Sequence, residues 1–147
     1  MMHKGWLMGL ATAALLAGCS TAPAPDYRGD QATAVSSPVV GPRWNLLLVG
    51  THERLSLPER AHFVIARDGS VSGSDGCNQL RGQVRLGERQ RIEFQDLATT
   101  RRGCAQAADA ERVREMLETA YRFLIDHDRL VFFGPDQRVL GGFRRAS

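Results

Sequence analysis

Lysine is almost absent from this chain of 147 residues, and no concentrated basic stretch takes its place. Of 19 basic residues only Lys4 is a lysine, and 16 acidic residues leave a formal net charge of +3. Arg81 and Arg85 alternate with apolar residues, as on a solvated sheet face. Nucleic-acid-binding surfaces cluster basic residues and add stacking aromatics. We therefore expect no nucleic-acid partner.

Short motifs for enzyme chemistry are also lacking. His52, His62 and His127 do not have the close spacing of a local zinc motif. No phosphate-binding loop or dinucleotide fingerprint is present. The segment Gly73-Ser74-Asp75-Gly76 has the wrong serine spacing for a nucleophile elbow. We expect no catalytic residue and no cofactor, and hence a protein that is not an enzyme.

One segment resembles the beginning of a calcium-binding loop. Asp68, Ser70, Ser72 and Gly73 have its spacing, but the twelfth position is Gln79 instead of a bidentate glutamate. Asp68-Gly69 is also a strong hairpin-turn signal, which explains the same residues. We therefore expect a turn here and no metal site.

The N-terminus has the pattern of a lipoprotein signal. Lys4 is followed by the apolar run Trp6–Ala17, which suits a signal-peptide core and is too short to span a bilayer. The run ends in Leu16-Ala17-Gly18-Cys19, a lipobox. We expect residues 1–18 to be removed and Cys19 to carry the lipid, including an acyl chain such as palmitate on its freed amine.

Two regions follow this signal. Residues 19–42 contain the lipidated cysteine and a stretch rich in Ser, Thr, Ala, Pro and Gly, which predicts a flexible tether. Residues 43–147 are long enough for one small domain. Ser20 replaces the aspartate that retains lipoproteins at the inner membrane. We therefore expect an outer-membrane protein whose domain faces the periplasm.

Cysteine is scarce, and two of the three residues remain after Cys19 is set aside. Cys77 and Cys104 would lie in an oxidising compartment, where a lone pair is expected to be bridged. Closing a loop of about 28 residues stabilises a domain by roughly 3.6 kcal/mol in the chain-entropy model. A redox-active pair is the alternative, but such pairs usually have C-x-x-C spacing. We favour a structural disulfide.

Alternating apolar residues predict strands near 43–49, 62–66, 71–74, 80–86 and 91–94, and a final hairpin over 130–133 and 139–143. One helix is predicted, with Asp109 as its N-cap. Its apolar stripe comprises Val113, Met116, Leu117, Ala120, Tyr121 and Leu124. We expect an α+β fold in which a small, partly rolled antiparallel sheet packs around this single helix, because no other segment could cover the sheet.

Three motifs resemble the META domain family and its HslJ-like heat-inducible lipoproteins. They are Trp44-Asn45-Leu46, the Gly-x-x-Gly-Cys-Asn turn at residues 73–78 with Gly82 beyond it, and residues 100–104 with Glu111 after them. Arg102-Gly103 replaces the usual Met-Ala. The resemblance implies an antiparallel sheet curled around one helix and a structural Cys77–Cys104 pair, with no catalytic residues.

The resemblance also implies a non-enzymatic role in envelope stress tolerance or drug resistance, including resistance to novobiocin. Besides the membrane, the expected partner is another envelope protein. The pair Arg101-Arg102, in the loop before Cys104, is a possible partner-binding site. Two alternatives are a pilotin-like module that binds a membrane-protein segment between helix and sheet, and an unrecognised periplasmic enzyme.

We predict that Cys19→Ser abolishes membrane attachment. Wild-type protein should fractionate with the outer membrane, whereas the variant should be released in the soluble periplasmic fraction. Membrane fractionation followed by immunoblotting measures the difference. Equal release of both proteins would contradict lipidation at Cys19.

Overall fold

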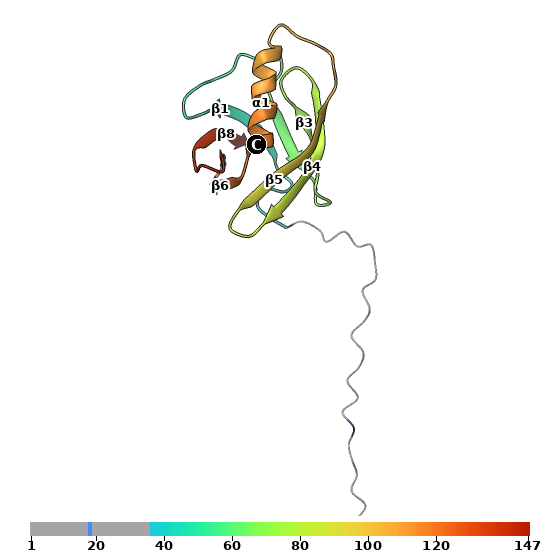
Figure 1. Ribbon diagram of the computed structural model, residues 1–147, viewed down its shortest axis with the longest axis vertical. Helices are drawn as coiled ribbons and strands as arrows, with labels where there is room; N and C mark the ends of the chain where they lie inside the picture. Colours follow the sequence, from blue (N-terminus) through green and yellow to red (C-terminus); the bar gives the residue numbers. More distant parts are fainter. Residues whose placement is uncertain (1–17, 19–35) are drawn as a thin grey trace, which may run out of the picture. The chain divides into compact units, whose positions relative to one another are not determined.

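The computed structural model describes residue 18 and residues 36–147 (Figure 1). The predicted signal peptide, Cys19 and most of the predicted tether therefore lie outside the described residues. The elements are, in chain order, β1 Arg43–Val49, β2 His62–Ile65, β3 Ser70–Ser74, β4 Gln79–Gly87, β5 Arg91–Thr99, α1 Ala107–Thr119, β6 Arg122–Asp126, β7 Arg129–Phe133 and β8 Val139–Arg145.

The eight strands form a closed antiparallel barrel in which neighbours in sequence are neighbours in the sheet. β8 closes the barrel by pairing with β1, with Leu46 opposite Phe143. The prediction of an antiparallel sheet with one helix is thus confirmed, but the sheet dominates and is fully closed. The pairing between β5 and β6 is the shortest, with Arg91 opposite Arg122 as its one register pair.

Phenylalanine side chains fill the barrel interior. Phe63 lies 5.7 Å from Phe94, 5.8 Å from Phe132 and 5.1 Å from Phe143, measured between ring centroids. Most of these pairs meet edge to face, an arrangement that aromatic rings favour. The strand residues expected to need a helical cover are therefore covered largely by one another, because the closed sheet brings opposite strands face to face.

Helix α1 packs against β5 and adds Met116 and Leu117 to the hydrophobic core, and Ala120 directly after the helix is also part of this core. It follows the end of β5, so it lies at the end of the barrel where β1 finishes and β8 begins. Met116 there shares a small cleft with Val49 and Leu140. The expected packing of the sheet with a single helix is observed, although strand residues make up most of the core. The helix covers one end of the barrel, and its opposite face, including Glu111, Glu115 and Glu118, is exposed.

The helix ends at Thr119, earlier than its apolar stripe predicted. Ala120 adopts an extended conformation with ψ 129°, and β6 then pairs with β7 through Phe123 and Phe132. Leu124 lies opposite Val131 on the outer face and is 54% exposed. The helical spacing of Tyr121 and Leu124 was outweighed by hydrogen bonding with the strand that follows.

The N-terminal cap also differs from the prediction. Gln106 is the N-cap residue, without a side-chain capping hydrogen bond, and Asp109 lies within the first turn. There its carboxylate is 3.6 Å from the guanidinium of Arg112. Because the helix begins before Asp109, that residue can favour the helix dipole but cannot cap it.

β5 extends to Thr99, although residues 96–103 have no period in the sequence. The register with β4 shifts between Arg81 and Gln83, and Asp96 has a positive φ of 53°. This bulge reverses the alternation, which hides the strand from a period-two pattern. Gly82 is needed at the bulge, since a Cβ there would lie 2.5 Å from the Leu97 side chain and 2.9 Å from the Gln95 carbonyl oxygen.

The packed region begins before the predicted boundary at residue 43. Val39 is fully buried, and its carbonyl oxygen accepts a hydrogen bond of 3.0 Å from the Trp44 indole. Gly41 also donates its backbone N–H to Ile65. Residues 39–41 are therefore part of the packed domain.

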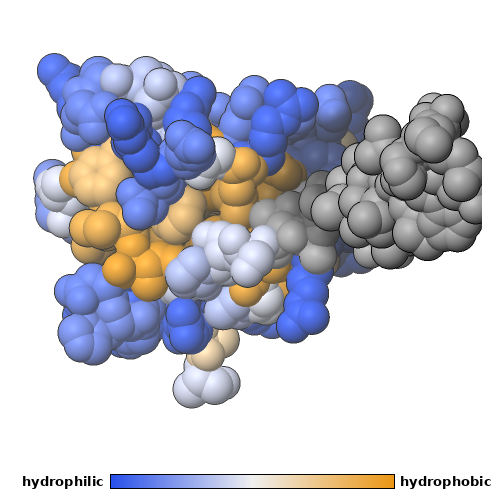
Figure 2. All heavy atoms as spheres, turned by 90° about the horizontal axis from the view of Figure 1, so that it is seen from below, coloured by the Kyte–Doolittle hydropathy of each residue, from blue (hydrophilic) through white to orange (hydrophobic). Residues whose placement is uncertain are grey.

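The surface seen from below the view of Figure 1 carries apolar residues between hydrophilic ones (Figure 2). Core-packed residues that stay partly exposed include Val40, Leu86 and Ile125. Among the described residues, no helix is long and apolar enough to cross a membrane.

We predict that Leu117→Ala lowers the free energy of unfolding by about 2–5 kcal/mol, because Leu117 is 1% exposed within the core. Leu124→Ala is the matched control and should cost much less, since that side chain is largely solvated. Chemical denaturation of both variants measures the two costs. Similar losses would mean that burial does not distinguish these positions.

Candidate functional site

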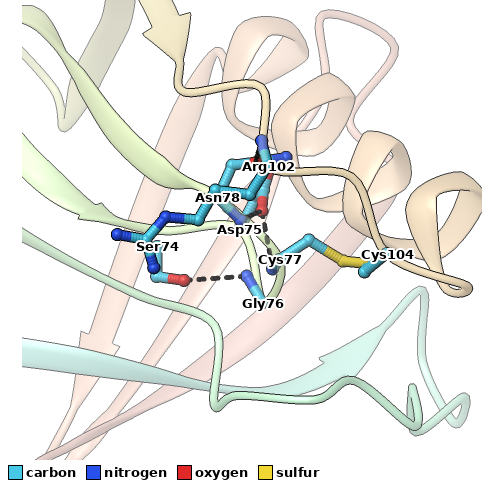
Figure 3. Close-up of a disulfide and its surroundings, with 7 residues drawn as sticks. All are labelled: Ser74, Asp75, Gly76, Cys77, Asn78, Arg102 and Cys104. Carbon is cyan, nitrogen blue, oxygen red and sulfur yellow. Dashed lines mark hydrogen bonds between the residues drawn. A yellow bond between two sulfur atoms is a disulfide. The ribbon is translucent and has the colours of Figure 1, made fainter.

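The residues that the sequence analysis singled out meet around a disulfide between Cys77 and Cys104 (Figure 3). Cys77 lies in the turn between β3 and β4, and Cys104 lies in the loop before α1. The bridge spans 27 positions with a Cα–Cα distance of 6.0 Å, which is usual for a disulfide. It links the loop before α1 to the turn between β3 and β4.

Asp75 organises the turn that carries Cys77. Its carboxylate oxygen Oδ1 accepts backbone hydrogen bonds from Cys77 at 2.9 Å and from Asn78 at 2.7 Å. Asp75 is only 3% exposed, whereas the two residues that donate to it are half-buried. The neighbouring Ser74 hydroxyl accepts a third bond, from Gly76 at 3.0 Å. In this turn, side-chain oxygens therefore accept the hydrogen bonds of backbone N–H groups that have no backbone acceptor.

Asn78 and Thr100 join this turn to the loop that leads to the helix. The Asn78 side-chain oxygen accepts a hydrogen bond from the Arg102 backbone N–H at 2.7 Å. The Thr100 hydroxyl accepts one from the Gln79 backbone N–H at 3.0 Å, and the Thr100 N–H donates to the Gln79 carbonyl at the same distance. The motif at residues 73–78 and the motif at residues 100–104 thus contact each other. We call this contact region the disulfide junction.

Gly76 connects the junction to the loop between β1 and β2. Its φ of +100° favours glycine, and a Cβ at this position would lie 2.6 Å from the Leu57 side chain. Its carbonyl oxygen also accepts a hydrogen bond from Glu59 at 3.1 Å. Gly76 therefore serves both the turn conformation and the close packing of a neighbouring loop.

Arg101 and Arg102 lie on the loop held by this junction, and both are exposed. The Arg102 backbone N–H is held by Asn78. The Arg102 guanidinium group makes no hydrogen bond to the described residues. Figure 3 shows Arg102 beside Asn78, on the loop that leads to Cys104. Cys19, the predicted lipidation site, lies outside the described residues.

The remaining polar candidates form ordinary turns. Asp68 accepts hydrogen bonds from the Ser70 N–H at 2.8 Å and the Ser70 hydroxyl at 2.6 Å, and these bonds lower the pKa of its carboxyl group. His127 contacts Asp126 in the exposed turn between β6 and β7. No group of three metal-ligating side chains occurs within residues 36–147.

An ion pair that the sequence analysis missed holds the helix to the β1–β2 loop. The Arg112 guanidinium donates to both carboxylate oxygens of Glu53, at 2.7 and 2.5 Å. The hydrogen bond from Arg112 lowers the pKa of Glu53 below its ordinary value of 4.5. The two residues are 59 positions apart, so no local spacing could have revealed the pair.

Together, the fold and the junction define a small antiparallel barrel closed at one end by a helix and braced by a disulfide. The META domain family model matches residues 37–147, and the chain therefore belongs to the META domain family. This confirms the resemblance drawn from the three sequence motifs, and HslJ-like proteins are members of the same family.

Solved structures share the fold at low sequence identity. A crystal structure of a DUF4847 family protein from Bacteroides vulgatus aligns with a TM-score of 0.55 at 12% identity, over 73% of this chain and 94% of that chain. An NMR structure of a protein from Burkholderia xenovorans aligns with a TM-score of 0.57 at 18% identity, over 74% and 84%. No curated protein matches the chain.

We predict that Asp75→Ala destabilises the domain by about 1–3 kcal/mol, because it leaves the half-buried backbone N–H groups of Cys77 and Asn78 without their acceptor. Asp68→Ala is the matched control, since Asp68 makes a similar turn on the exposed surface. Thermal and chemical denaturation of both variants test the difference. An equal loss in the two variants would contradict a special role for the buried turn.

Proposed function

We propose that this META domain protein is a lipid-anchored, non-enzymatic envelope protein that supports stress tolerance or drug resistance. The lipobox at residues 16–19 supports the anchor, and membership of the META family supports the envelope role. The disulfide suits an oxidising compartment outside the cytoplasm. The outer membrane is the proposed site of attachment, with the barrel facing the periplasm.

The single observation that carries the non-enzymatic reading is how the family motif is used. The Asp75 carboxylate binds backbone N–H groups, the Asn78 amide oxygen binds the Arg102 N–H, and the cysteines are bonded to each other. Groups that could otherwise act as a base, a nucleophile or a ligand are thus engaged in bracing the fold. This use favours a stable platform over an active site.

The loop with Arg101 and Arg102 is the proposed contact for an acidic envelope partner. Its backbone is held by the disulfide and by Asn78, so its two exposed guanidinium groups are presented from a fixed loop. A fixed loop loses little conformational freedom on binding, and guanidinium groups pair well with carboxylates or phosphates.

The pilotin-like alternative needs an apolar groove between helix and sheet. The apolar stripe of α1 instead packs into the core through Ala110, Val113, Met116 and Leu117. The cleft left beside Met116 measures about 230 Å³, which is small for a protein segment. A periplasmic enzyme is the other alternative, and the occupied polar groups of the junction weigh against it.

A complementation experiment tests the proposal. In a strain that lacks the gene, survival should fall under heat stress or novobiocin, and wild-type protein should restore it. Cys19→Ser should restore it poorly, because the domain would no longer be held at the membrane. Arg101→Ala with Arg102→Ala should also reduce rescue if this loop contacts the partner. Survival counts and immunoblots for protein level provide the measurement.

The matched control is Arg67→Ala with Arg85→Ala, which removes two exposed arginines from elsewhere on the barrel. This variant should rescue as well as wild type. A deletion strain that survives as well as its parent under both stresses would contradict the proposed role. Full rescue by Cys19→Ser would contradict the need for an anchor.

A further inference from the structure

A second surface, distinct from the disulfide junction, has the features of a small-molecule site. A cleft of about 450 Å³ lies against the outer face of β1. Its walls are the β1–β2 loop at residues 54–60, the end of β8 at residues 144–145, and residues 146–147 that follow it. This volume is within the range of known ligand pockets. Asn45 and Leu46 of the first sequence motif line it, whereas the residues of the other two motifs do not.

Four arginine side chains line this cleft, namely Arg54, Arg60, Arg144 and Arg145, whereas Glu59 is the acidic side chain among the lining residues. Among the described residues, Arg54, Arg60 and Arg145 form no ion pair with a carboxylate. Arg144 is 3.3 Å from Asp128. The cleft thus concentrates positive charge that the protein itself leaves largely unpaired.

The floor of the cleft is apolar. Leu46 and Leu47 come from β1, and Leu55 and Leu57 come from the loop above it. All four are partly exposed, so they offer apolar surface inside an otherwise polar rim. A ligand that paired only with the arginines would leave these leucine side chains exposed to water. A ligand with an apolar part would cover them.

The walls of the cleft are held in place by contacts already described. Leu57 packs against Gly76, and Glu59 donates its N–H to the Gly76 carbonyl, which fixes one end of the loop. Glu53 fixes the other end through Arg112. The Arg145 guanidinium lies 5.2 Å from the centre of the Trp44 ring. A preformed site needs less ordering when a ligand binds.

We propose that this cleft binds an anionic amphiphile, with its carboxylate or phosphate group on the arginines and a short apolar chain on the leucines. Guanidinium groups recognise such oxyanions through paired N–H donors, and the low content of acidic side chains favours a negative ligand. A lipid headgroup with its chain and a soluble anionic metabolite with an apolar tail share this chemistry. The inference does not depend on the anchor or on a stress role.

Titration of the purified protein with octyl phosphate, below its micelle concentration, tests the proposal. Calorimetry should show saturable binding of one molecule per chain, at least ten-fold tighter than inorganic phosphate. Octyl glucoside should not compete, because it lacks the charge. Amide NMR signals of Asn45, Leu47 and Arg60 should shift. Competition by phosphatidylglycerol vesicles would assign the ligand to lipid, and its absence would assign a soluble amphiphile.

Arg54→Gln with Arg60→Gln should weaken octyl phosphate binding at least ten-fold, because both side chains lie on the cleft wall and neither makes an internal ion pair. Arg67→Gln with Arg85→Gln removes the same charge outside the cleft and should leave binding within two-fold of wild type. Equal weakening in both pairs would overturn the proposal in favour of general electrostatic attraction. Failure of octyl phosphate to bind better than inorganic phosphate would also overturn it.

Discussion

The hydrogen bonds of the buried Asp75 carboxylate are the interaction on which the rest of this structure depends. They shape the β3–β4 turn so that Cys77 can reach Cys104 and Asn78 can reach the Arg102 backbone. These links fix the loop before α1, and the loop fixes where the helix begins. The helix can then cover the end of the barrel and bring Met116 and Leu117 into the core.

The position of the helix compensates for the short pairing between β5 and β6 in the barrel. β5 and β6 share one register pair, at Arg91 and Arg122, whereas the other neighbouring strands pair over several residues. The helix is the connection between these two strands, and it packs against β5 where pairing to β6 is lacking. Apolar contacts with the helix therefore replace strand hydrogen bonds at this position. The disulfide adds to this by limiting the freedom of the unfolded chain between Cys77 and Cys104.

The junction and the exposed arginines of the molecule differ in how their polar groups are satisfied. Polar groups at the junction are satisfied internally, while arginines on the loop at residues 101–102 and in the cleft beside β1 are left to the solvent. Gly76 links the two regions, because it packs under Leu57 in the wall of the cleft. The turn that carries Cys77 thus supports one wall of the cleft, which the first family motif also lines through Asn45 and Leu46.

Local sequence determined much of this protein. Period-two alternation identified most of the strands, the Asp68-Gly69 turn marked a hairpin, and the number of cysteines indicated the Cys77–Cys104 pair. It also revealed Val113, Met116 and Leu117 as one buried helical face. These features were predictable because each depends on neighbours in the chain: a turn, a period or a spacing.

Tertiary structure decided the rest, because those features depend on partners far apart in sequence. Pairing with β7 ended the helix before Leu124, and a bulge at Gly82 hid the second half of β5 from any regular period. Closure of β8 onto β1 let the phenylalanines cover one another, so the helix became an end cap. The bond between Glu53 and Arg112 and the arginine-lined cleft likewise join distant segments. Only the folded chain could place these residues together.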